Sequence, residues 1–226
     1  MLRQILMGGS TKELLIAFIM SLPIMMLSLS VHESAHGFIA HKCGDDTAYN
    51  FGRITLNPIK HLDPVGFLCM MLVGFGWAKP VPVNSRNFRN PKRGIILTSL
   101  AGPISNLLLG FLFAVIYKFY IMIISDLIIT SEQQALILMA VSMLLWYAIS
   151  INVSLAVFNL FPVPPLDGSK ILFSLLPYKI YYKFIMPYER YINLAFSLLV
   201  ILGVLSPVIS WCASHIMNLY FLILGM

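Results

Sequence analysis

Three long apolar runs, separated by polar stretches, dominate the hydrophobic pattern of this chain. They cover residues 14–41, 94–117 and 135–161. Each is long enough for a helix that crosses the hydrocarbon core of a bilayer, which takes about 20 apolar residues. The pattern therefore predicts a spanning helix over each run, with a kink at Pro23 in the first and a break or kink at Gly102–Asn106 in the second.

Two further apolar segments do not fit a simple span. Phe67–Phe75 is too short to cross a bilayer, so we expect a re-entrant or interfacial helix there. The tail after Arg190 contains no Lys, Arg, Asp or Glu and is interrupted at Ser206-Pro207. Because proline disrupts a helix interior, the tail predicts two short helices broken at that point, or one kinked helix and a surface segment.

The polar stretch after the first run has a different pattern. Tyr49–Pro58 is rich in aromatic and β-branched residues, which favours one or two short strands. Residues 76–84 are stiffened by prolines and predict extended chain. Together the elements predict an all-α membrane fold. We expect a polytopic helical bundle of about 4–6 transmembrane helices, with a small β element on the cytoplasmic side and a re-entrant or interfacial segment.

Composition supports an integral membrane protein. Of 226 residues, 59% are hydrophobic and 11% are charged, and mean hydropathy is +0.86, whereas soluble domains carry about 25% charged residues. No polar block is large enough for a separate soluble domain. The net charge of +6 comes from basic residues in loops, and with no long basic face nucleic-acid binding is excluded. No Cys-x-x-Cys pair occurs among Cys43, Cys69 and Cys212, so neither a thiolate zinc site nor a disulfide framework is expected.

The positions of Lys and Arg predict the orientation in the membrane. The stretch 42–93 holds eight of them, the stretch 163–190 holds four, and the loop 126–132 holds none. Short cytoplasmic loops carry the excess of Lys and Arg. The first and third predicted spans therefore both end on the cytoplasmic side, and the second runs between them.

A His-Glu-x-x-His motif, His32-Glu33-Ser34-Ala35-His36, lies near the end of the first predicted span. On a helix, His32 and His36 lie one turn apart on one face. Two imidazoles so placed can hold a zinc ion, and Glu33 can act as general base on its water. A carboxylate at the end of the uncharged run Leu14–Val31 is costly, which by default indicates function. The alternative is a chance pair of histidines on an apolar face, and the intervening Glu33 disfavours it.

Asp167 is the candidate third ligand. Of the nine acidic residues, only Glu33 and Asp167 lie within long apolar contexts. Asp167 directly follows the third predicted span, on the same side as the histidines, and catalytic zinc usually has three protein ligands and an open position. The prolines before Asp167 would unwind the chain and turn the carboxylate inward. A turn or helix cap before Gly168 is the alternative role.

Three motifs together carry a family resemblance: His32-Glu33-x-x-His36, Gly102-Pro103-x-x-Asn106 and Asn159-x-x-Pro162-x-Pro164-x-Leu166-Asp167-Gly168. In this order and in apolar context they resemble the site-2 protease family of intramembrane zinc metalloproteases. The segments 51–58 and 76–83 resemble its compact bacterial and archaeal members. The resemblance implies one zinc ion held by His32, His36 and Asp167. It also implies Glu33 as general base, and Asn159 as a residue that positions the substrate or the oxyanion.

The same resemblance implies the wider function. We expect an intramembrane zinc metalloendopeptidase that hydrolyses peptide bonds of a transmembrane protein or peptide substrate. We expect it in the bilayer of a prokaryotic cell membrane, with the active site near the cytoplasmic side. Residues 14–172 form the expected catalytic core of a single membrane domain over 1–226, and 173–226 form C-terminal membrane segments. The sequence identifies neither the substrate nor the oligomeric state.

Two other functions could use the same ligands. An ion or metal transporter would need further acidic or histidine residues along a path, and the sequence offers only this cluster. An inactive scaffold descended from a protease would have no need of Glu33. For Asn159, the alternative role is a backbone-capping amide at the helix end. No catalytic role is assigned to Asn106, expected to pack or to cap a kink, to His41 and His61, expected at the surface, or to His215.

Overall fold

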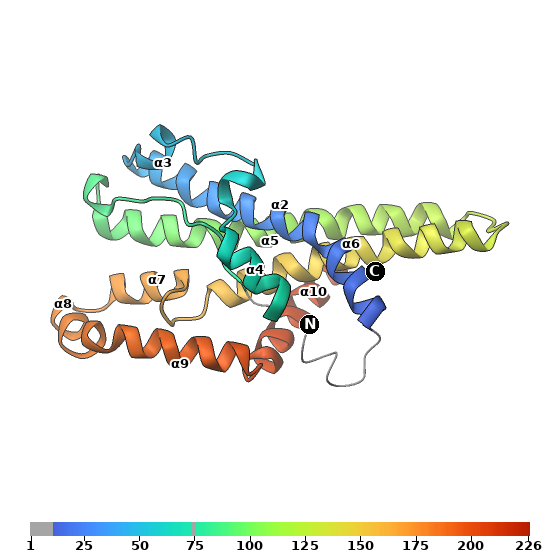
Figure 1. The fold of residues 1–226 in the computed structure, drawn as a ribbon. Coiled ribbons are helices and arrows are strands. Elements are labelled where there is room, and N and C mark those ends of the chain that lie inside the picture. Colours follow the sequence, from blue (N-terminus) through green and yellow to red (C-terminus); the bar gives the residue numbers. More distant parts are fainter. Residues whose placement is uncertain (1–10, 74–75) are drawn as a thin grey trace.

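The computed structural model describes residues 11–73 and 76–226 and is mostly helical (Figure 1). Its centre consists of three long helices: α2 (Thr11–Cys43), α5 (Pro91–Ser125) and α6 (Glu132–Asn159). α5 packs along α6, and α2 packs against both. These three helices bring together the segments that carry the sequence motifs.

Among the described residues, three helices are long and apolar enough to cross a bilayer: α5, α6 and α10 (Ser206–Leu224). The second and third predicted spans are thereby confirmed as helices, with somewhat different ends. α5 continues through Gly102 and Pro103, so this dipeptide does not break the helix. The first predicted span lies within α2, a single helix that contains Pro23, and its crossing of the membrane stays a prediction.

Small and apolar side chains hold the long helices together. Ala114 of α5, Ile149 and Val153 of α6 and Ala213 of α10 belong to one buried cluster. α5 comes close to α6 at Gly110, where an added Cβ would lie 3.3 Å from the Cβ of Asn152. Such close packing fixes α5 relative to α6, and both helices carry polar side chains toward the candidate site.

The predicted β element at Tyr49–Pro58 is wrong. Its first residues belong to the short helix α3 (Thr47–Asn50), and its last begins the 3-10 turn η1 (Pro58–His61). Within the described part of the chain, pairing is limited to an isolated bridge between Leu62 and Ala78.

In this stretch, side chains rather than a neighbouring strand form hydrogen bonds with the backbone. Asn57 Oδ1 accepts from the N–H of Ile59 at 3.1 Å and so caps η1. The N–H of Thr55 donates to Ser34 Oγ of α2 at 3.2 Å. Asn and Ser side chains compete with backbone pairing between strands in this way. The β-propensity of the residues alone does not take that competition into account.

The remaining helices are short: α4 (Pro64–Val73), η2 (Ser85–Asn87), α7 (Asp167–Leu175), α8 (Tyr178–Ile180), the π-helical η3 (Tyr181–Ile185), η4 (Met186–Tyr188) and α9 (Glu189–Ile201). α4 confirms a short helix in the run Phe67–Phe75, whose last two residues lie outside the described part. α9 and α10 confirm the two-helix alternative for the tail. Ser206-Pro207 begins α10, where a proline in the first turn removes no intrahelical hydrogen bond.

The bundle has two distinct ends (Figure 1). At one end, the second half of α2, the first half of α5 and the last turn of α6 lie near α7, and α7 packs against α5. At the other end, residues 126–131 connect α5 to α6 and are exposed. Figure 1 shows α5 and α6 extending beyond the other helices there. The sequence motifs all lie at the first end.

Candidate metal centre

His32 and His36 lie one turn apart on α2, and both are buried. Their rings meet edge to face, with centroids 4.6 Å apart. His36 Nδ1 lies 2.6 Å from the main-chain oxygen of Thr98, and His32 Nδ1 lies 2.6 Å from Asn106 Oδ1. Because these oxygens only accept hydrogen bonds, each Nδ1 carries a proton. In the neutral form of each ring, this leaves the Nε2 lone pair for a metal ion.

Asp167 meets both rings from the first turn of α7. Its Oδ2 lies 3.2 Å from His32 Nε2 and 3.1 Å from His36 Nε2, while Oδ1 accepts from Lys170 Nζ at 2.9 Å. Burial raises the pKa of Asp167, but its contacts with the two histidines and the charge of Lys170 outweigh burial. They hold that pKa well below its usual range. The side chain is therefore an ionised carboxylate at neutral pH.

This group of three side chains fits a zinc ion. Ligand atoms held about 2.0–2.1 Å from one tetrahedral ion lie roughly 3.3 Å apart, close to the separations of Asp167 Oδ2 from the two imidazole nitrogens. Two neutral imidazoles and a carboxylate are also a set that catalytic zinc uses. Gly102 of α5 provides the space, because a Cβ there would lie 2.5 Å from Nε2 of both histidines.

Asn106 and Asn152 extend the site into the bundle, and both are fully buried. Asn106 Nδ2 donates to Ser28 O at 3.2 Å and to Asn152 Oδ1 at 2.9 Å. Asn152 Nδ2 donates to Ala148 O at 2.8 Å. Asn106 thus contacts a candidate ligand as well as packing in the bundle. In the sequence, both residues are recognisable only as an amide side chain within a long apolar run. That pattern does not by itself indicate that they lie next to the candidate metal site.

Glu33 lies half-buried beside the three ligands, and its Oε2 accepts from the N–H of Val81 at 2.9 Å. Val81 belongs to residues 76–84, where the structure has neither helix nor sheet, consistent with the predicted extended chain. We call these residues the 76–84 segment. A carboxylate has about four acceptor positions, so this contact orients Glu33 and leaves other positions for a proton.

Arg53 and His61 also hold the 76–84 segment in place. The Arg53 guanidinium donates to Lys79 O at 2.8 Å, and the N–H of Lys79 donates to His61 O at 2.8 Å. His61 is buried, so the expected surface position is wrong for this residue. The reason is that η1 places its ring against α2, where His61 Nε2 lies 3.5 Å from Ser34 Oγ.

Asp45 ties the 76–84 segment to the end of α2. Its fully buried carboxylate accepts from the N–H of Asn84 at 2.7 Å, from Asn87 Nδ2 at 2.8 Å and from the N–H of Thr47 at 3.2 Å. Burial raises the pKa of Asp45, but hydrogen bonds from Thr47, Asn84 and Asn87 lower it by more, so the net pKa lies below its usual value. The segment that contacts Glu33 is therefore anchored by a buried anion.

The three candidate ligands and Glu33 line one cavity of about 670 Å³. Its walls include Trp77, Pro80, Val81, Val83, Phe88 and Ile95, and Asn159 also lines it. Asn159 Nδ2 donates to Leu155 O one turn back at 2.9 Å, which matches the capping alternative. That bond uses one of the two amide hydrogens. A mostly apolar cavity with a few convergent polar groups is typical of a ligand-binding site.

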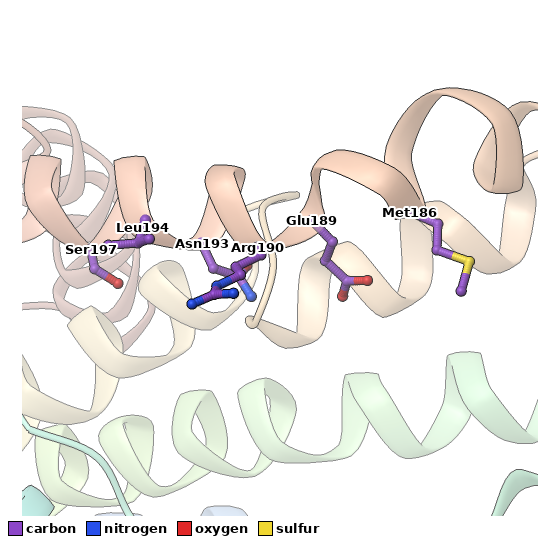
Figure 2. Close-up of a pocket in the computed structure, with 6 residues that line it drawn as sticks. All are labelled: Met186, Glu189, Arg190, Asn193, Leu194 and Ser197. Carbon is purple, nitrogen blue, oxygen red and sulfur yellow. The ribbon is translucent and has the colours of Figure 1, made fainter.

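A second cavity, about 600 Å³, lies along α9 (Figure 2). It is lined by Met186, Glu189, Arg190, Asn193, Leu194 and Ser197. These lining residues include neither His nor Cys, and none of them lines the first cavity. The chemistry expected from the sequence therefore lies in the first cavity.

The two remaining histidines lie outside the metal group. His41 is partly exposed, and its Nδ1 lies 2.6 Å from Asp46 Oδ1. His215 on α10 bonds within its own helix, with Nδ1 2.8 Å from Trp211 O. Neither lines the cavity that Glu33 faces.

Comparison with known proteins gives a consistent assignment. The family described as "Peptidase family M50" matches residues 19–202, a range that contains His32, Glu33, His36 and Asp167. A relative from Bacillus subtilis (strain 168), named "Putative zinc metalloprotease YwhC", is 42% identical over 153 residues, 68% of this chain and 67% of the relative.

Two more distant relatives carry similar names. Rip2 of Mycolicibacterium smegmatis is 28% identical over 67% of this chain and 55% of its own length. MJ0611 of Methanocaldococcus jannaschii is 28% identical over 70% of this chain and 71% of its own length. Each of their names also begins "Putative zinc metalloprotease". No solved structure matches the chain.

Proposed function

The chain belongs to peptidase family M50 and is a zinc metalloprotease of the membrane, and from that premise we propose that it cleaves peptide bonds of transmembrane substrates with Glu33 as general base. One observation carries the proposal: the buried group His32, His36 and Asp167 opens, together with Glu33, into one cavity. A metal site with only a structural role has no need of a base beside it.

Each residue has a defined role in this mechanism. His32, His36 and Asp167 would hold a zinc ion, which would supply Lewis-acid chemistry at the site and make a water more acidic. Glu33, held in place by the Val81 N–H, would take a proton from a water in the cavity and later deliver it to the leaving amine. The second amide hydrogen of Asn159 donates to the scissile carbonyl oxygen as negative charge develops there.

The surroundings of the cavity support an apolar, membrane-embedded substrate. Apolar side chains such as Trp77, Phe88 and Ile95 form part of its walls, and two of the helices that line it, α5 and α6, are long and apolar enough to cross a bilayer. A substrate helix must unwind locally, because its carbonyls are engaged in its own hydrogen bonds. Lys and Arg concentrate in the stretches next to the site, so we place the site near the cytoplasmic side of a prokaryotic cell membrane.

Glu33→Gln tests this proposal in purified protein reconstituted with a transmembrane substrate. Glutamine keeps an oxygen for the Val81 N–H but has no basicity. We expect the variant to retain one zinc ion per chain and to lose cleavage by a factor of about 10²–10⁴. A chelator should stop cleavage by the unchanged protein, and added Zn²⁺ should restore it.

Glu132→Gln is the matched control, since Glu132 lies in the exposed first turn of α6, at the opposite end of the bundle. It should cleave at the rate of the unchanged protein. Cleavage by Glu33→Gln at that same rate would overturn the role of Glu33. Zinc binding that survives replacement of His32 and Asp167 would overturn the metal site.

A transporter that uses the same ligands is less well supported. A transit path needs several successive sites, whereas among the described residues the group at His32, His36 and Asp167 is the one set of metal-type ligands that converges. Zinc-dependent uptake into vesicles that persists without any cleaved product would favour transport.

A further inference from the structure

A chain of amides leads from one zinc ligand into the most deeply buried part of the bundle. Asn106 on α5 and Asn152 on α6 are both 0% exposed, between helices whose other buried residues are mostly small or apolar. An amide in such surroundings is costly unless its hydrogen bonds are satisfied. Among the described residues, His32 is the one charged or metal-ligating group that this series of amide hydrogen bonds reaches.

Two main-chain carbonyls determine the direction of every hydrogen bond in this chain. Ala148 O can only accept, so the NH₂ group of Asn152 faces it and Asn152 Oδ1 faces Asn106. The NH₂ group of Asn106 must then face Asn152, and it also donates to Ser28 O. Asn106 Oδ1 is left facing His32 Nδ1 at 2.6 Å, so the proton of the ring is on Nδ1.

From this we propose that Asn152 is a positioning residue for the metal centre, which acts on His32 through the Asn106 amide. With Asn152 in place, Asn106 Oδ1 holds the His32 proton on Nδ1 and keeps the Nε2 lone pair directed at the ion. If the Asn106 amide turned over, its NH₂ group would face Nδ1. The ring would then carry its proton on Nε2 and could not bind metal through that atom.

The second histidine shows why only one ligand needs such a chain. His36 Nδ1 contacts Thr98 O directly, at 2.6 Å. A main-chain carbonyl within a helix cannot exchange acceptor for donor, whereas a side-chain amide can by rotating. Asn152 therefore acts on His32 and not on His36, and it orients the Asn106 amide together with Ser28 O. This inference rests on the proposed function in one respect, that His32 is a zinc ligand.

The test measures metal affinity rather than cleavage. Full-length protein in detergent is freed of metal, and its affinity for Zn²⁺ is measured by competition with a chromophoric chelator. Removing a group that directly holds a ligand typically weakens binding about 10- to 100-fold, which is our expectation for Asn106→Leu. For Asn152→Leu, one step further away, we expect a loss of about fivefold.

The double variant gives the decisive result. If Asn152 acts through Asn106, Asn152→Leu should change affinity by less than about twofold once Asn106 is already leucine. An equal fivefold loss in both backgrounds, or no loss in either, would overturn the proposal. Absorption spectra of the Co²⁺-loaded proteins supply a second readout, and the spectrum should change in Asn152→Leu because the His32 ring is held less firmly.

Two variants separate this role from packing. Val153→Ala removes buried volume from the same turn of α6 and should leave zinc affinity within about twofold, so a fivefold loss there would assign the effect to packing. Asn152→Ser can still bond Ala148 O but is too short to reach Asn106, and it should lose affinity as Asn152→Leu does. His32→Ala tests the premise separately, because unchanged Zn²⁺ binding by that variant would reject the site itself.

Discussion

Gly102 shows how strictly the proposed metal centre would depend on single residues. The residue lies on α5 directly against the two histidines, and the hydrogen in place of a side chain leaves the space between them and Asp167 open. Helix propensity alone would favour alanine over glycine by about 1 kcal/mol in a helix interior. The glycine therefore serves the site at some cost to the helix.

We predict that Gly102→Ala strongly weakens zinc binding while the protein still folds. The added methyl would lie 2.5 Å from Nε2 of His32 and of His36, so it would occupy the ligand side of both rings. We expect a loss of Zn²⁺ affinity of about 100-fold, the upper end of the range seen when groups that orient metal ligands are removed. Chelator competition would measure this loss.

Leu108→Ala is the control on the same helix, because the Leu108 side chain is 66% exposed and does not line the cavity of the site. We expect zinc affinity within about twofold of the unchanged protein. Normal zinc binding by Gly102→Ala would contradict the steric argument.

At the scale of residues, the sequence predicts those whose side-chain type itself indicates a catalytic or metal-binding role. His32, Glu33, His36 and Asp167 follow from a motif and from the rarity of acids in apolar runs. Asn152 and Gly102 act through where they lie on α6 and α5, because one bonds a neighbouring amide and the other has no side chain. Those functions depend on how the helices pack, which the hydrophobic pattern does not specify.

At the scale of elements, the 76–84 segment is held by side chains rather than by a sheet. It contacts Glu33 through Val81, Arg53 through Lys79, and the end of α2 through Asn84 and Asp45. The Asp45 carboxylate is the one buried anion in that set of contacts. Its ionisation therefore couples the position of the segment to pH.

We predict that this anchoring is lost in acid. Because the folded pKa of Asp45 lies below its unfolded value, its stabilising contribution is complete above about pH 4 and declines as pH falls further. Asp45→Asn should remove much of that dependence. It should also lower stability at pH 7 by about 1.5–3 kcal/mol, the range for hydrogen bonds to a charged group.

Thermal unfolding in detergent between pH 3 and about 7 would measure the effect, and hydrogen exchange of the Asn84 amide would locate it. Asp46→Asn is the control, because the Asp46 side chain is 61% exposed and contacts His41 at the surface. If Asp45→Asn and Asp46→Asn had the same pH profile, the assignment to Asp45 would fail.

The sequence predicts the long elements better than the short ones. Uncharged runs of bilayer length leave little alternative to a helix, and α5, α6 and α10 follow from them. The stretch 49–58 has the composition of a strand, yet Asn57 and Ser34 bond its backbone and no sheet forms there. A contact between Thr55 and a residue of α2 some twenty positions away is not encoded in local propensity.

At the scale of the whole molecule, helix length fixes how deep the site can lie. From Gly102 to Ser125, α5 rises about 35 Å, which already exceeds the roughly 30 Å of a hydrocarbon core. If Ser125 lies at one face of the bilayer, the metal centre must lie at or near the opposite face. The Lys and Arg residues concentrate around that end of the bundle, which predicts that it faces the cytoplasm.

Cysteine labelling tests this orientation. In a background with Cys43, Cys69 and Cys212 replaced by alanine, Ser131→Cys lies in the exposed loop between α5 and α6, and Asn90→Cys lies just before α5. A membrane-impermeant maleimide should label Ser131→Cys in intact cells. It should label Asn90→Cys only after the cells are permeabilised. The reverse pattern would place the metal centre on the outer side, and the substrate bond would then be cleaved at the external face of the membrane.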